Sequence, residues 1–143
     1  MNSIDDGRRI MSKSCVIISG QTIVLDHLLF QGLCRFAEVI QNANNRLLPA
    51  ILDKHRIDLI LFELTCADLA EVKLILQLKN KFPLIEIVLL DDCDDSDLRA
   101  QAFAFGVRDA FRKPYKIDLI VERVQALLQQ TERGPTRCRN PVV

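Results

Sequence analysis

The densest charged segment of this chain is the run Asp91-Asp92-Cys93-Asp94-Asp95-Ser96-Asp97. Carboxylates at this density could bind a divalent cation, and Glu63 could join Asp91 and Asp92 as a third oxygen ligand. A second explanation needs no metal, because Asp and Ser at a helix start accept hydrogen bonds from free amides and complement the helix dipole. We favour this capping role for residues 94–97 and keep Glu63, Asp91 and Asp92 as candidate metal ligands.

Other catalytic chemistry finds little support in the residue pattern. The five cysteines include no C-x-x-C pair, and the two histidines, His27 and His55, lie far apart in the sequence, so no zinc framework is recognisable. Cys66 and Cys93 are expected in loops at one edge, but no adjacent cation activates them, which favours two unconnected thiols over a redox pair. The chain also lacks a G-x-S-x-G elbow, a phosphate-binding Gly-rich loop and an H-E-x-x-H motif, so we do not expect an enzyme.

The overall composition describes one globular domain. The chain has 143 residues, and its 19 basic side chains balance 19 acidic ones. This balance creates no long-range field that would attract nucleic acid or an anionic membrane. No apolar stretch reaches the length of a membrane span, and residues 1–13 lack the apolar core of a signal peptide, so we expect a cytoplasmic protein. The folded unit is predicted to cover residues 14–130, between a flexible segment (1–13) and a flexible tail or linker (131–143).

Short apolar stretches alternate with segments of helical periodicity along this unit. The expected strands cover residues 15–18, 37–41, 58–62, 85–90 and 107–111. The first expected helix has Thr22 as its N-cap and an apolar face made of Leu25, Leu28, Leu29 and Leu33. The second starts after Asn44 or Asn45, with Pro49 in its first turn, and the others cover residues 68–79, 96–105 and 115–130. Gly106 is expected to close the helix that precedes it.

Alternating strands and helices predict a doubly wound α/β fold, with a five-stranded parallel sheet and helices on both faces, of the flavodoxin-like type. In such folds the binding crevice lies beyond the carboxyl ends of the strands. The candidate site therefore combines residues 19–22, 63–68, 91–97 and 112–115.

Three segments resemble the receiver domain of two-component response regulators. Residues 55–64, with the sequence HRIDLILFEL, resemble its third strand, and residues 105–114, with the sequence FGVRDAFRKP, resemble its fifth strand with the terminal Lys-Pro. Residues 38–45 fit its second strand and the opening of its second helix. The resemblance covers almost all of residues 14–130. It implies a bacterial phosphorelay domain in which two acids after the first strand and an aspartate ending the third bind Mg²⁺, and that aspartate accepts a phosphoryl group.

The sequence departs from this pattern at the site itself. Ser19-Gly20-Gln21 follows the first strand, so the acid pair is missing, and Glu63 stands at the phospho-acceptor position. The longer glutamate displaces the carboxylate by about 1.5 Å, which spoils in-line geometry in a preorganised site. Asp91 occupies the hydroxyl position, and Ala110 occupies the aromatic switch position. Only Lys113 is retained, so the resemblance implies a pseudo-receiver that binds no cofactor; Mg²⁺ would be needed only if the site were active.

The role of Lys113 stays open at this stage. Its ammonium could pair permanently with Glu63 or Asp91 and fix the crevice in one state, in which Glu63 would imitate a phosphorylated acceptor. A simply inert site and a solvated lysine are the other interpretations.

The resemblance implies that the domain acts through protein contacts on the face of the fourth helix, fifth strand and fifth helix. The partner there would be a second copy of the chain, a histidine kinase or an output domain. The candidate contact residues are Arg99, Gln101, Arg108, Arg112, Lys116, Asp118, Glu122 and Arg123. Their alternating signs suit self-association better than direct contact with nucleic acid.

Two alternatives remain: an active regulator phosphorylated at an atypical carboxylate, and an adaptor that binds a small ligand between residues 19–22 and Asp91 and Asp92. A faint similarity of residues 26–33 to receivers with DNA-binding outputs hints at transcription regulation.

Overall fold

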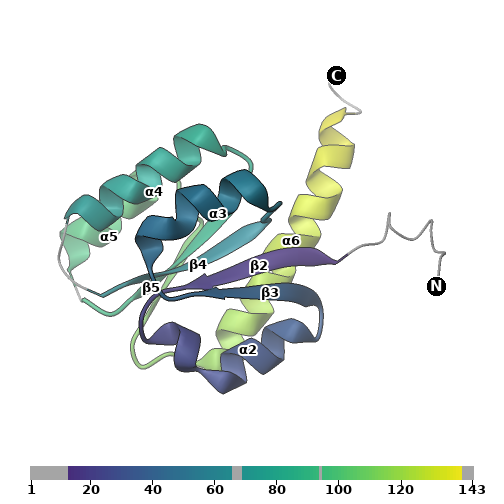
Figure 1. Ribbon diagram of the computed structural model, residues 1–143. Coiled ribbons are helices and arrows are strands. Elements are labelled where there is room, and N and C mark those ends of the chain that lie inside the picture. Colours follow the sequence, from purple (N-terminus) through teal and green to yellow (C-terminus); the bar gives the residue numbers. More distant parts are fainter. Residues whose placement is uncertain (1–12, 66–68, 94, 140–143) are drawn as a thin grey trace.

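The computed structural model describes residues 13–65, 69–93 and 95–139, the last of these ranges as backbone only beyond residue 130. Five parallel strands form one sheet: β2 (Ser14–Ser19), β3 (Ala37–Asn42), β4 (Leu59–Leu64), β5 (Glu86–Asp91) and β6 (Asp109–Arg112). Their order is β3-β2-β4-β5-β6 (Figure 1). The chain first adds β3 on one side of β2 and then adds β4, β5 and β6 on the other side. The fold is therefore the doubly wound, flavodoxin-like one expected from the sequence.

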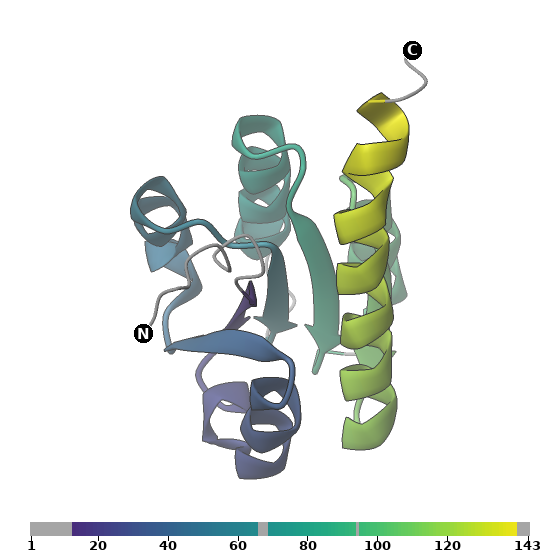
Figure 2. The ribbon, with the colours of Figure 1, turned by 90° about the vertical axis from the view of Figure 1, so that its right-hand side faces the viewer.

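Helices cover both faces of the sheet, as the views in Figures 1 and 2 show. The helices α2 (His27–Cys34) and α6 (Ile117–Arg139) cover one face, while α3 (Leu48–Lys54), α4 (Leu69–Lys81) and α5 (Ser96–Ala104) cover the other. Two short 3₁₀ helices, η1 (Ile23–Leu25) and η2 (Asn45–Leu47), follow β2 and β3. Within the described residues, no helix combines the length and the apolar character needed to cross a membrane.

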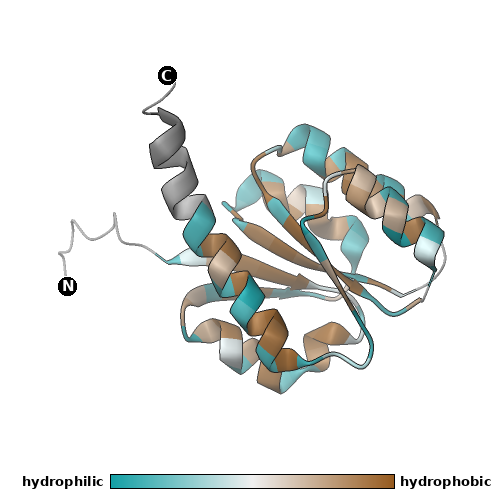
Figure 3. Ribbon diagram, turned by 180° about the vertical axis from the view of Figure 1, so that it is seen from behind, coloured by the Kyte–Doolittle hydropathy of each residue, from teal (hydrophilic) through white to brown (hydrophobic). Residues whose placement is uncertain are grey.

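The core divides into two layers because strand side chains alternate between the faces. Ile17, Ile60 and Phe62 face α3, α4 and α5, whereas Val16 and Leu61 face α2 and α6. All six residues of β4 are buried, as expected of a central strand covered on both sides. Figure 3 shows the same arrangement as apolar strands behind helices that carry polar residues outward.

The first helix differs from its prediction. The loop after β2 forms η1, and α2 begins only at His27, where the Asp26 side chain accepts a hydrogen bond from the amide of Leu29 at 3.0 Å. Asp26, rather than Thr22, is therefore the cap. Leu29 and Leu33 are buried as predicted, but Leu25 and Leu28 are exposed because the break at Asp26 turns them out of the expected stripe.

The last helix also differs from its prediction. It continues through Gly134 and Pro135 to Arg139, where the sequence pattern predicted a helix end near residue 130 and a flexible tail. A proline inside a helix removes one backbone hydrogen bond, which costs stability but still permits the helical path. Figures 1 and 2 show α6 extending beyond the other elements.

Candidate functional site

Glu63 is the central residue at the carboxyl edge of the sheet. It lies on β4 and is fully buried. Its Oε1 accepts hydrogen bonds from the backbone amides of Thr22 at 3.0 Å and Ile23 at 3.1 Å, and its Oε2 accepts one from the Thr22 hydroxyl. Buried carboxylates need such donors to compensate for lost hydration. The donors come from the turn after β2, so Glu63 ties the centre of the sheet to that loop.

Gly20 makes this arrangement possible. Its φ is +149°, and a Cβ built on it would lie 2.3 Å from Glu63 Cβ and 2.4 Å from Glu63 Oε1. Any side chain at position 20 would therefore overlap the glutamate. Position 20 lies within Ser19-Gly20-Gln21, the segment in which the resemblance implies the acid pair, so an acid at position 20 and the buried glutamate exclude each other sterically.

A network of amide side chains lies beside Glu63. The Ser19 hydroxyl donates to Asn45 Oδ1 at 2.5 Å, and Asn42 Nδ2 donates to Ser19 Oγ at 2.9 Å. Asn45 Nδ2 donates to the backbone carbonyl of Glu63 at 3.0 Å and to Glu71 Oε2 at 3.2 Å. Asn45 was expected only as a possible helix cap, and Asn42 was not expected at the site. Their place at the carboxyl end of the second strand was the signal that could have identified them.

Asp91 is held by a cation on the next helix. Its side chain is fully buried, and Arg99 Nη1 lies 2.6 Å from Asp91 Oδ2. Burial by itself would raise the pKa of Asp91, but hydrogen bonds from Arg99 and Cys93 lower it below its usual value. Arg99, expected on a partner surface, thus turns inward to Asp91. Its side chain is 18 % exposed, and a partner would reach little of it.

Cys93 belongs to the same cluster. Its thiol donates to Asp91 Oδ1 at 3.3 Å, and burial together with this carboxylate raises its pKa to about 11. A thiol with such a pKa is a poor nucleophile at neutral pH. Cys66, the other member of the imagined redox pair, lies outside the described residues.

Lys113 lies 3.1 Å from Asp92 Oδ2 and is half exposed. Of the interpretations left open for Lys113, the pairing with Glu63 or Asp91 is not the one seen, and those carboxylates have the donors named above. Ala110 lies half-buried on β6 and packs against the core layer of α3, α4 and α5. Tyr115 packs against the other core layer, and its hydroxyl is buried without a hydrogen-bond partner among the described residues. Burial and the charges of Glu63 and Asp92 raise the pKa of Tyr115.

These residues do not fit a Mg²⁺ site of the receiver type. The segment Ser19-Gly20-Gln21 stands where the two acids are needed, and Ser19 Oγ is already hydrogen-bonded to two asparagines. The candidate ligands Glu63, Asp91 and Asp92 bind three different sets of donors. In the part of the chain that the structure describes, no group of three Asp, Glu, His or Cys side chains could hold a metal. The displaced cation site considered from the sequence is therefore not formed by these three residues.

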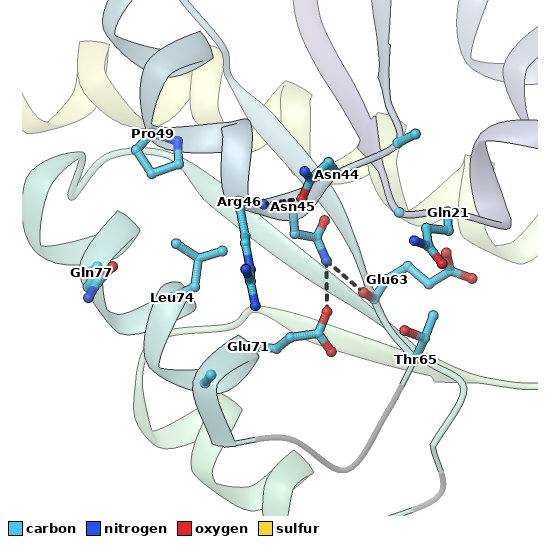
Figure 4. Close-up of a pocket in the computed structure, with 13 residues that line it drawn as sticks. Gln21, Asn44, Asn45, Arg46, Pro49, Glu63, Thr65, Glu71, Leu74 and Gln77 are labelled. Atoms are coloured by element: carbon cyan, nitrogen blue, oxygen red, sulfur yellow. Dashed lines mark hydrogen bonds between the residues drawn. The ribbon is translucent and has the colours of Figure 1, made fainter.

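A cavity of about 550 Å³ with both polar and apolar lining residues opens beside this cluster, toward α3 and α4. Figure 4 shows Gln21, Asn44 and Arg46 on one side of it and Glu71, Leu74 and Gln77 on the other. The crevice expected between residues 19–22 and the acids Asp91 and Asp92 is not this cavity, because neither acid lines it.

No family model and no curated protein matches the sequence. Solved structures of receiver domains are nevertheless similar in fold. A CheY-like receiver domain protein from Methanospirillum hungatei JF-1 has a TM-score of 0.77 at 16 % identity, with 86 % of this chain and 99 % of that chain covered. The receiver domain of a putative Luxo repressor protein from Vibrio parahaemolyticus has a TM-score of 0.74 at 16 % identity, covering 87 % and 96 %. An orphan response regulator of H. pylori has a TM-score of 0.70 at 22 % identity, covering 79 % and 94 %. The fold is thus that of response-regulator receiver domains.

Proposed function

We propose that this chain is a receiver-like regulatory domain of bacterial two-component signalling that acts through protein contacts without being phosphorylated. The observation that carries this proposal is the buried Glu63 carboxylate, which accepts three hydrogen bonds from Thr22 and Ile23. An acceptor must be reachable by the phosphoryl donor and needs a cation to offset the developing charge. Glu63 is neither exposed nor flanked by the acids that would bind that cation.

The second element of the proposal is that the crevice stays in one state. The ion pair between Asp91 and Arg99 ties the end of β5 to α5, and Glu63 ties β4 to η1. A shift between two states needs a ligand or modification that prefers one of them, and both ties use groups of the chain itself. We favour this inert site over imitation of a phosphorylated acceptor, because the Lys113 ammonium contacts Asp92 and not Glu63.

Amide NMR spectra of the reduced protein test the proposal, first with Mg²⁺ and then with beryllium fluoride, a phosphoryl mimic. We expect no shift at residues 63, 91 and 113 and no spread to β6. Labelling with a small acyl phosphate and Mg²⁺ should also give no phosphoprotein. The matched control is Glu63→Gln: Mg²⁺-dependent shifts or label in the wild type that disappear in this variant would show an active acceptor and overturn the proposal.

The protein partner is proposed to bind α5, β6 and α6. Lys116, Asp118 and Glu122 are exposed there, and the half-exposed Leu119 helps to line a shallow cavity of about 350 Å³ together with Phe111. Opposite charges around an apolar residue suit a second copy of the same surface. We therefore propose a homodimer through this face, with a histidine kinase or an output domain as further partners in the cytoplasm.

A further inference from the structure

A lysine side chain holds the turn that joins α4 to β5. Lys79 lies in the last turn of α4, and its Nζ donates to the backbone carbonyl of Ile85 at 2.7 Å and to that of Pro83 at 3.1 Å. Burial lowers the pKa of Lys79 below its ordinary value, which indicates that the ammonium is partly removed from water. The two carbonyls therefore replace water as the acceptors for this charge.

The turn that Lys79 holds is a short one. The amide of Ile85 donates to the Phe82 carbonyl at 3.2 Å, which closes a four-residue turn with Pro83 in its second position. Leu84, the third residue, is 89 % exposed and lies between the two residues whose carbonyls Lys79 binds. One hydrogen bond within a turn contributes little, whereas hydrogen bonds from a charged group contribute more. Lys79 is thus the main support of this turn.

The path of the Lys79 side chain depends on Gly106, which follows the end of α5. The φ of Gly106 is +113°, and a Cβ built on it would lie 3.0 Å from Lys79 Cε and 3.3 Å from Lys79 Cγ. The missing side chain leaves room for the methylene groups of the lysine. Lys79 therefore contacts both the turn of residues 82–85 and the loop that leads to β6.

We propose that Lys79 is a clamp that keeps the turn of residues 82–85 closed, and that the turn opens as a local unit when the ammonium leaves the two carbonyls. In the closed turn, Leu84 has one fixed position on the surface. In the open turn, the peptide bond between Leu84 and Ile85 is accessible. Such local openings cost less free energy than global unfolding. This inference goes beyond the proposed function and does not depend on it, because the turn lies at the amino edge of the sheet, opposite Glu63.

Limited proteolysis of the native protein with chymotrypsin, followed by mass spectrometry, tests the clamp. Chymotrypsin cuts after leucine, and cleavage of a locally opened segment follows the population of its open form. Lys79→Met removes the charge and keeps a long side chain, so we expect cleavage after Leu84 to become at least about tenfold faster, the equivalent of one hydrogen bond from a charged group. Cleavage after Leu61, on the buried strand β4, requires global unfolding and should change much less.

The matched control is Lys73→Met, which removes an exposed lysine from the same helix and should leave both cleavage rates unchanged. Gly106→Ala supplies a second test, because its new Cβ would displace the Lys79 side chain. It should also speed cleavage after Leu84, but it should add little in a Lys79→Ala background. The proposal fails if Lys79→Met cleaves like the wild type, if cleavage after Leu61 rises by the same factor, or if the effects of Gly106→Ala and Lys79→Ala are additive.

Discussion

Gly20 and Glu63 depend on each other at the scale of single residues. We expect Gly20→Ala to lower the free energy of unfolding by more than about 2 kcal/mol, because the new Cβ overlaps the glutamate and the positive φ is strained. Urea denaturation measures this loss. In a Glu63→Gly background the same substitution should cost less, and an unchanged cost would contradict the steric link.

The buried pair of Asp91 and Arg99 predicts a pH-dependent stability. The folded pKa of Asp91 lies below its ordinary value of 3.8, so its stabilisation is complete above that pH and is lost as the pH falls through the folded pKa. Asp91→Asn should therefore cost about 3 kcal/mol at neutral pH and progressively less in acid.

The exposed pair of Lys81 and Asp53 provides the control for this prediction. Asp53→Asn should change the free energy of unfolding by less than about 0.5 kcal/mol. Equal losses for the two variants, or a loss for Asp91→Asn that does not shrink in acid, would contradict the assignment of the Asp91 charge.

The sequence was enough to bring candidate residues to one edge of the sheet, but not to predict which groups contact them. Glu63, Asp91 and Lys113 were correctly placed at one edge, because parallel strands bring their carboxyl ends together. Which donor meets which carboxylate depends on distances of a few ångströms between loops, and residue types do not encode these distances. The contact of Lys113 with Asp92 was therefore not among the pairings considered, and the Thr22 and Arg99 contacts were missed.

At the scale of elements, the separation of η1 from α2 depends on Asp26. Removing its side chain in Asp26→Ala should lower the free energy of unfolding by about 1 kcal/mol, since the amide of Leu29 loses its acceptor. Thermal unfolding with Asp53→Ala as the matched control tests this, because Asp53 caps no helix and lies on the surface. Similar effects of both substitutions would show that the cap contributes nothing specific.

The strands were predictable because buried parallel strands are apolar throughout, as in Leu59–Leu64. Helix boundaries were less predictable. The first helix shows why: the tertiary contact of Glu63 with the amides of Thr22 and Ile23 competes with the local preference for one continuous helix. A similar limit applies to Pro135, whose usual role as a helix breaker does not end α6.

At the scale of the whole molecule, the proposed homodimer can be tested by charge reversal. Arg108 contacts Glu86 at 3.1 Å and Gln130 at 3.1 Å on the proposed face. We expect Arg108→Glu to reduce the mass measured by light scattering from dimer to monomer, since like charges would then face each other across the interface. Arg56→Glu, the same reversal elsewhere, should leave the mass unchanged. A dimer that persists in Arg108→Glu would place the interface on another surface.

The central strand β4 is buried on both faces and paired on both edges, with β2 and with β5. Its amides can therefore exchange with solvent deuterium only when the whole domain unfolds, so their exchange rate measures global unfolding. A molecule that binds the native state lowers this exchange rate, and it does so more strongly the more tightly it binds, wherever on the surface it binds. Deuterium exchange at Ile60 and Leu61 would thus report the formation of the proposed dimer as a slower exchange at higher protein concentration.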